Sequence, residues 1–228
     1  MRKFILLTLL NSVALFSQYA SAGVMVDWIV NVDGAISENY NGDPLPLTGE
    51  LTDGFGTLSM KVTGEGFHSV IGFFDFEIDQ QVNTFFNESG SATGTAAAGQ
   101  SWEIDEPGYL FGDIVDNVYS GSLDNSNGVP VGAEDDMSFA MGWDFSLQAD
   151  DMAIIDFIFT DILPSVDFFI SHFDADSNSE FYFYSALSIQ NSGAPVVPPV
   201  TSVDEPSTLV IMFIGLLFVV SRKIKYKA

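Results

Sequence analysis

The feature that most constrains the fold of this chain is a strict alternation of apolar and polar residues over residues 137–148. Every second residue there is large and apolar: Met137, Phe139, Met141, Trp143, Phe145 and Leu147. The residues between them are small or polar. Successive side chains of a β-strand point to opposite faces of a sheet, so this pattern predicts a strand with one face in a core.

Shorter strands are predicted along most of the chain from Gly23 onward. Turn signals rich in Gly, Asn and Asp recur between them, as in residues 124–128. Besides 137–148, the predicted strands cover residues 24–32, 55–63, 74–79, 82–86, 101–104, 109–119, 152–160, 166–173 and 181–190. Residues 88–100 form either a loop or a weak strand, and no amphipathic helix competes. About ten short strands predict one all-β domain over residues 23–193, an antiparallel β-sandwich or jelly roll.

The N-terminus has the order of a secretory signal. Met1-Arg2-Lys3 is basic, residues 4–16 are mostly apolar, and Ala20-Ser21-Ala22 is a small-residue cleavage site. This order predicts a signal peptide over residues 1–22, with an uncleaved anchor as the alternative.

The C-terminus carries a second apolar segment. Residues 194–203 contain three prolines and predict an extended linker. An uncharged run then ends in four basic residues among the last seven. We expect a transmembrane helix over residues 207–221, about 22 Å long at 1.5 Å per residue and therefore short for a hydrocarbon core of about 30 Å. The basic end would stay in the cytoplasm, and an ordinary membrane anchor is one interpretation.

Residues 204–228 also resemble the PEP-CTERM sorting signal of Gram-negative bacteria. The resemblance lies in Asp204, Glu205, Pro206 and Ser207, followed by the short apolar helix and the basic end. Asp204 stands where the family has its first proline, and lysines outnumber the usual arginines. The resemblance implies an exosortase as processing partner and transient residence in the cytoplasmic membrane. It also implies a final location at the cell surface or outside it, with exopolysaccharide or biofilm material.

Charge is distributed very unevenly. Of the seven basic residues only Lys61 lies between the two terminal segments, whereas all 31 acidic residues lie between Asp27 and Glu205. One cation against 31 carboxylates leaves the exported part with a net charge of about −30. Such a surface argues against nucleic acid as a partner, because nothing would neutralise phosphates. Its self-repulsion must be screened by salt or by bound cations.

The sequence gives little sign of catalysis. The two histidines, His68 and His172, lie near no nucleophile motif, and the absence of cysteine disfavours zinc and iron–sulfur sites. Carboxylates are so numerous that no glycosidase pair stands out. The predicted function is therefore a non-enzymatic exported surface or extracellular-matrix protein. A carbohydrate-binding β-sandwich module and, third, a glycan-acting hydrolase are the alternatives.

Two candidate sites follow from residue type and spacing. The first is a calcium site at Asp174, Asp176, Asn178 and Glu180, where oxygen ligands recur at every second residue. It lacks the glycine of an EF-hand loop, and a solvated hairpin is the alternative. Residues 134–136 are a second calcium candidate, whereas the acidic ladder 75–79 is expected to face solvent.

The second site is a carbohydrate site at Trp102. This residue follows Gly99-Gln100-Ser101 and is expected to be exposed, whereas Trp28 and Trp143 alternate with polar residues and are expected in the core. An exposed tryptophan on a sheet or loop rim suits sugar binding.

Overall fold

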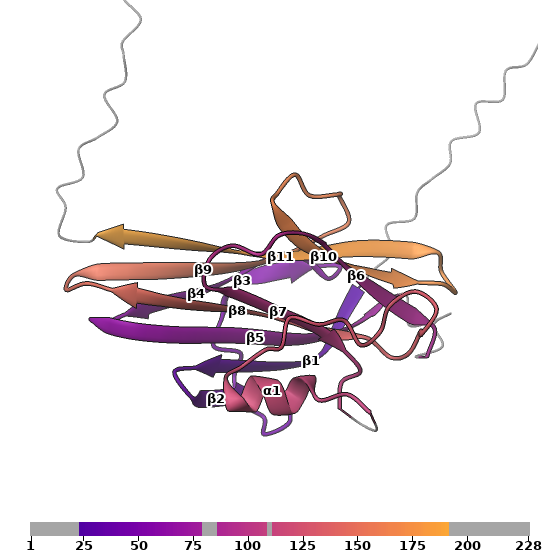
Figure 1. Cartoon of the computed structure of the whole chain (residues 1–228), viewed down its shortest axis with the longest axis horizontal. Coiled ribbons are helices and arrows are strands. Elements are labelled where there is room, and N and C mark those ends of the chain that lie inside the picture. The colour runs from indigo at the N-terminus through magenta and orange to yellow at the C-terminus, as the bar shows by residue number, and fades with distance from the viewer. Residues whose placement is uncertain (1–22, 79–85, 109–110, 192–228) are drawn as a thin grey trace, which may run out of the picture. The chain divides into compact units, whose positions relative to one another are not determined.

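The computed structural model describes residues 23–78, 86–108 and 111–191 and shows two antiparallel β-sheets with one short helix (Figure 1). The predicted signal peptide, linker, transmembrane helix and sorting motif lie outside the described residues. Within those residues, no helix is long and apolar enough to cross a membrane.

The first sheet has five strands in the order β2-β1-β5-β8-β7. These are β1 (Gly23–Val32), β2 (Ala35–Glu38), β5 (Gly66–Ile78), β7 (Gln100–Asp105) and β8 (Ser138–Leu147). The second sheet has six strands in the order β3-β4-β9-β11-β10-β6. These are β3 (Thr48–Thr52), β4 (Phe55–Thr63), β6 (Glu88–Gly94), β9 (Asp151–Thr160), β10 (Phe168–Asp174) and β11 (Ser179–Asn191).

The core lies between the two sheets and is rich in phenylalanine. The first sheet contributes Phe74, Phe76 and Phe139, and the second contributes Phe157, Phe159, Phe181 and Phe183. The Phe139 and Phe183 rings have centroids 4.7 Å apart across the interface. Fully burying one such ring stabilises the fold by about 1.5–3 kcal/mol. The all-β prediction, with two facing antiparallel sheets, is confirmed, and the strand predicted over residues 137–148 appears as β8.

One predicted strand is wrong. Residues 109–119 were expected to be extended, but Ile114–Ser120 form helix α1, which ends at Gly121 in the left-handed conformation. Ile114 and Val118 pack against the outer face of the first sheet, in a cluster with Phe73. Their spacing of four residues suits a helix, but the β-branched residues favoured a strand locally, and packing on the sheet decided the outcome.

The acidic ladder was also predicted wrongly. Asp75 and Glu77 were expected to face solvent, yet each is only 4% exposed. They lie on the outer face of β5, a central strand, and Pro107 and α1 lie over that face beside Asp75. Asp79 lies outside the described residues. Alternation therefore identified the two faces of β5 correctly but could not reveal that a second layer covers the polar one.

Candidate functional site: a neutral groove beside Trp102

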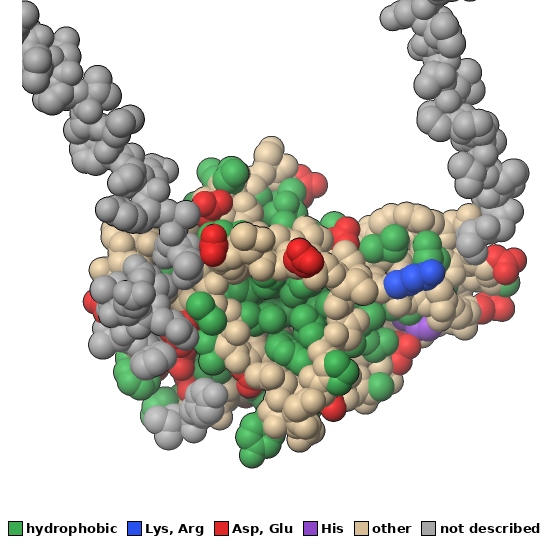
Figure 2. All heavy atoms as spheres, turned by 180° about the vertical axis from the view of Figure 1, so that it is seen from behind, with side chains coloured by type: hydrophobic (Ala, Val, Ile, Leu, Met, Phe, Trp, Pro, Cys, Tyr) green, Lys and Arg blue, Asp and Glu red, His purple; other side chains and the backbone are tan. Residues whose placement is uncertain are grey.

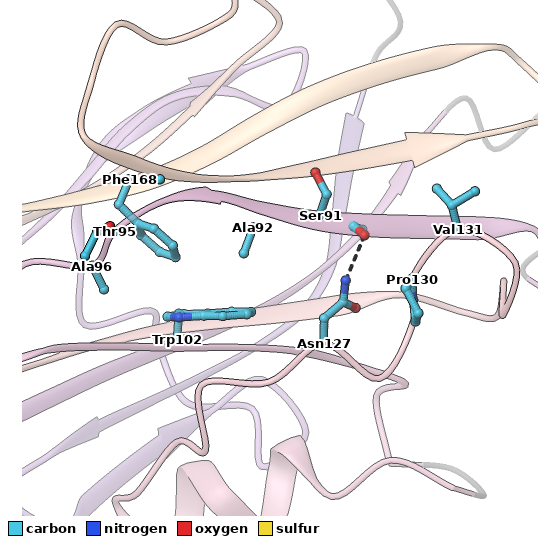
Figure 3. A pocket seen from close by; sticks show the side chains of 11 residues that line it. Ser91, Ala92, Thr95, Ala96, Trp102, Asn127, Pro130, Val131 and Phe168 are labelled. Carbon is cyan, nitrogen blue, oxygen red and sulfur yellow. Dashed lines mark hydrogen bonds between the residues drawn. The ribbon is translucent and has the colours of Figure 1, made fainter.

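A groove of about 670 Å³ opens between β6 and β7 (Figure 3). These two strands are edge strands of different sheets, so the groove lies along one open side of the sandwich. Eleven described residues line it, and none of them is charged. This neutrality contrasts with the 31 acidic residues of the chain, and Figure 2 shows acidic side chains scattered over one face.

Trp102 forms one wall of the groove and is half-buried. Its backbone pairs with Met141 of β8, and its amide donates to Asn125 Oδ1 at 3.1 Å, so β8 and the loop at Asn125 both fix its position. Its ring lies against Phe168, with centroids 5.7 Å apart and planes at 47°. Trp28 and Trp143 are buried, as expected. Trp102 is thus the tryptophan that a ligand outside the core can reach.

Some polar groups of the groove already make hydrogen bonds within the protein, and others do not. The Asn127 side chain donates to Gly90 O at 2.9 Å and accepts from Val129 N at 2.9 Å, so it holds the loop against β6. Ser91 Oγ contacts Ser171 Oγ at 2.9 Å. Within the described part of the chain, Trp102 Nε1 and Thr95 Oγ1 make no hydrogen bond and remain available to a ligand.

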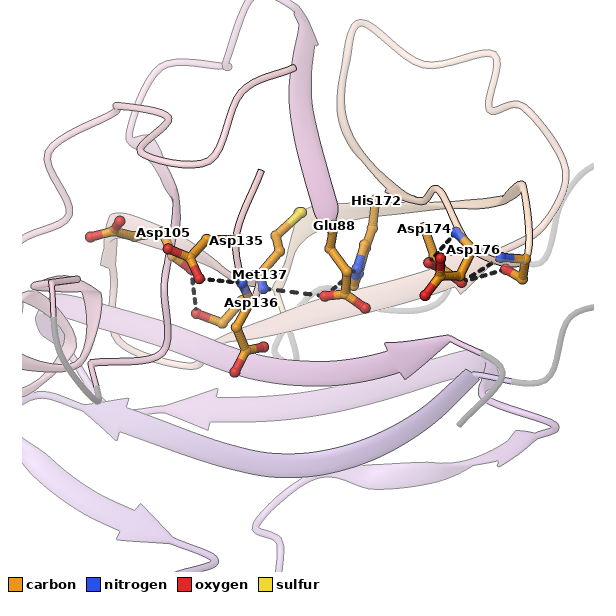
Figure 4. Close-up of polar contacts among 10 residues, drawn as sticks. Glu88, Asp105, Asp135, Asp136, Met137, His172, Asp174 and Asp176 are labelled. Atoms are coloured by element: carbon orange, nitrogen blue, oxygen red, sulfur yellow. Dashed lines mark hydrogen bonds and ion pairs between the residues drawn. The ribbon is translucent and has the colours of Figure 1, made fainter. Parts of the chain in front are cut away.

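The structure places the predicted calcium ligands in the hairpin between β10 and β11 (Figure 4). Asp174 is fully buried and caps the turn: Oδ1 accepts from Asp176 N at 2.9 Å and Oδ2 from Ser177 N at 3.1 Å. Asp176, Asn178 and Glu180 are exposed. The carboxylate that would anchor an ion is therefore already bonded to its own turn.

Glu88 and His172 form a buried ion pair that the sequence did not indicate. Glu88 Oε2 lies 3.0 Å from His172 Nε2 and accepts from Met137 N at 3.2 Å (Figure 4). Their side chains are at most 1% exposed. Neither ring nitrogen of His172 makes a hydrogen bond to a described residue. The two residues are far apart in sequence, and only the pairing of β6 with β10 brings them together.

Two further groups of three carboxylates occur among the described residues. In the first, Glu103 accepts from Asn117 Nδ2 at 2.9 Å and Asp124 N at 3.2 Å, and Asp105 accepts from Asp113 N at 2.9 Å. Burial raises the pKa of Glu103 to about 7, although these hydrogen bonds oppose the shift. Hydrogen-bond donors of the protein thus satisfy the carboxylates of Glu103 and Asp105.

The second group joins Asp75 and Glu77 of β5 to Asp136, which precedes β8. Asp136 is the only residue of the second calcium candidate, residues 134–136, that belongs to this group. Burial, followed by the charges of Asp136 and Glu77, raises the pKa of Asp75 to about 8. Sequence reasoning missed the group because Asp75 and Glu77 looked solvent-facing.

Comparisons of the chain with protein-family models, with curated proteins and with solved structures found no match. What the protein does must therefore be inferred from its own residues.

Proposed function

We propose that this protein is a non-enzymatic exported protein of the cell surface or extracellular matrix, and that its sandwich binds neutral polysaccharide in the groove beside Trp102. One observation carries this proposal. A domain with one cation and many carboxylates keeps a groove whose described lining is entirely uncharged and includes an accessible indole.

The chemistry of the groove matches a neutral sugar. A sugar ring offers C–H groups to an aromatic face and hydroxyls to nearby donors and acceptors, which is the mixture of apolar walls and few polar groups that small-ligand sites use. Trp102 and Phe168 supply the aromatic walls, while Thr95 Oγ1 and Trp102 Nε1 supply hydrogen-bonding groups. No carboxylate in the described lining would have to lose its hydration when a sugar binds.

The same lining favours binding over cleavage. Most glycoside hydrolases use two carboxyl groups on either side of the scissile bond, about 5–10 Å apart. The described residues that line the groove include no Asp or Glu. Hydrolysis at this position would therefore need residues from elsewhere in the chain.

Export and sorting complete the proposal. Residues 1–22 would direct secretion, and residues 204–228, through their resemblance to PEP-CTERM signals, would hold the precursor in the cytoplasmic membrane until an exosortase removes the tail. The released domain would lose four basic residues and become nearly a pure polyanion. Such a domain would associate with polysaccharide through a neutral groove, since charge attraction to acidic polymers is unavailable to it.

A binding experiment tests the groove. The full-length chain is screened on an array of neutral and acidic glycans, and the affinity for any hit is measured by calorimetry. Trp102→Ala should weaken binding at least tenfold, which corresponds to about 1.4 kcal/mol. Tyr40→Ala is the matched control, because Tyr40 is an exposed aromatic residue that does not line the groove. Equal affinities of the Trp102 variant and the parent chain would refute the groove as the site.

Mass spectrometry of the mature protein's termini tests sorting. We expect an N-terminus at Gly23 and loss of residues after the sorting motif. A mature chain that still ends at Ala228 would contradict processing and leave a simple membrane anchor.

A further inference from the structure

We propose that Asp75, Glu77 and Asp136 bind one calcium ion on the outer face of the five-stranded sheet. The site is separate from the groove and from the β10–β11 hairpin. One carboxylate oxygen from each of the three residues lies within 4.8 Å of the other two. Asp75 and Glu77 are on the same face of β5, and the pairing of Asp75 with Ser138 brings Asp136 alongside them.

The second observation is an unpartnered buried oxygen. Asp75 is 4% exposed, and its Oδ1 atom is buried without a hydrogen-bond partner. Asp136 Oδ1 is likewise buried and without a partner. Native proteins rarely leave buried polar atoms unsatisfied, and such an atom calls for a bound ion or water. In the first carboxylate group, by contrast, backbone and side-chain donors satisfy Glu103 and Asp105.

The described residues place little positive charge beside Asp75 and Asp136. Asp27 and Glu88 add further negative charge around Asp75. The described part of the chain contains one Lys or Arg, Lys61, and it lies on β4 of the other sheet. His172 faces Asp136 but is already paired with Glu88. Neither Asp75 nor Asp136 therefore has a Lys or Arg partner among the described residues.

The ligand chemistry selects calcium. Calcium binds oxygen ligands at about 2.3–2.6 Å, so two ligands on opposite sides of one ion lie up to about 5 Å apart. The 4.8 Å limit of the cluster fits such a shell. Zinc prefers nitrogen and sulfur ligands in structural sites, and magnesium requires a tighter octahedron. Asp75 also lines a cavity of about 170 Å³ together with Asp27 and Glu38, which gives the ion an acidic route to the site.

The test is a calcium titration of the full-length chain after treatment with EDTA, at ionic strength held constant with NaCl. Calorimetry should show binding of calcium at the cluster, and a hundredfold excess over Kd should raise the melting midpoint by about 5–10 °C. Asp75→Asn should weaken calcium binding at least tenfold. Without calcium, that variant should melt no lower than the parent chain, because it removes a carboxyl group whose ionised form is disfavoured by burial and by neighbouring charges.

Two matched variants assign the site. Glu103→Gln changes a buried carboxylate of the satisfied group and should leave calcium affinity unchanged. The double variant Asp176→Asn/Glu180→Gln removes charge from the hairpin and should also retain binding. The proposal is overturned if calcium does not raise the melting midpoint of the parent chain above its value in NaCl at the same ionic strength. It is also overturned if Asp75→Asn binds calcium as tightly as the parent, or if only the hairpin variant loses calcium affinity.

Discussion

At the scale of single residues, the buried polar groups of this protein differ in how they are compensated. Glu88 has a histidine and a backbone amide, Asp174 has the amides of its own turn, and Asp75 Oδ1 has no partner. The residue types alone could not reveal this. Asp174 was predicted as an ion ligand from its spacing, and its hydrogen bonds to the amides of Asp176 and Ser177 depend on a turn that only the folded hairpin defines.

The Glu88–His172 pair should be important for stability. Glu88→Ala would leave the Met137 amide without its acceptor and the buried His172 ring without the carboxylate beside it. Removing one member of a buried pair costs about 3–5 kcal/mol. Chemical denaturation measures the loss. Glu65→Ala is the control, because Glu65 is exposed and such changes usually stay within about 0.5 kcal/mol. A similar small loss for both variants would show that the pair is dispensable.

Glu103 should make stability depend on pH. Its folded pKa of about 7 lies above its ordinary value of 4.5, chiefly because of burial. Between these values the folded chain retains a proton that the unfolded chain has lost, so the contribution of Glu103 to stability falls as pH rises through this window.

Glu103→Gln removes this titration and keeps an amide oxygen for Asn117. In EDTA, the variant should gain stability relative to the parent chain as pH rises from about 5 to about 8, by up to about 3 kcal/mol. Melting curves across that range measure the difference. A difference that does not change with pH would contradict the buried, proton-retaining carboxyl.

At the scale of elements, the alternation in β8 was sufficient to predict the strand and its core face. Met137 and the alternate residues after it are buried, as the pattern required. The opposite face was harder, because Ser138 and Ala140 are buried too, beneath the layer that includes α1. A short helix with two β-branched contacts gives no periodic signal of its own, so neither α1 nor the burial of Asp75 could be predicted.

Gly72 in β5 illustrates how closely the two sheets approach. A Cβ atom there would lie 2.8 Å from a ring carbon of Phe74 and 2.9 Å from Phe157 Cζ. Gly72→Ala should therefore force core rings from their positions and cost about 1–3 kcal/mol. Denaturation midpoints measure this, with the exposed Thr57→Ala as a control in β4. A Gly72 variant as stable as the parent would show that the core has room to adjust.

At the scale of the whole molecule, the charge distribution bears on the proposed export. A domain with a net charge of about −30 repels itself unless salt or bound cations screen that charge. The sequence predicted that distribution, the sandwich class and the tryptophan at the groove. It could not predict the groove itself, because Trp102, Thr95 and Phe168 come from separate strands and loops that meet only when the two sheet edges lie together.

The central claim is that a neutral glycan binds at Trp102, and indole NMR tests it most directly. The chain has three tryptophans and so gives three indole N–H signals, which Trp→Phe variants assign. Trp143 Nε1 donates to Ser185 Oγ at 2.9 Å in the core and serves as an internal control. On titration with the neutral oligosaccharide that binds best on the array, the Trp102 signal should move in a saturable way while those of Trp28 and Trp143 stay. A glycan that binds without moving the Trp102 signal would contradict the proposed site.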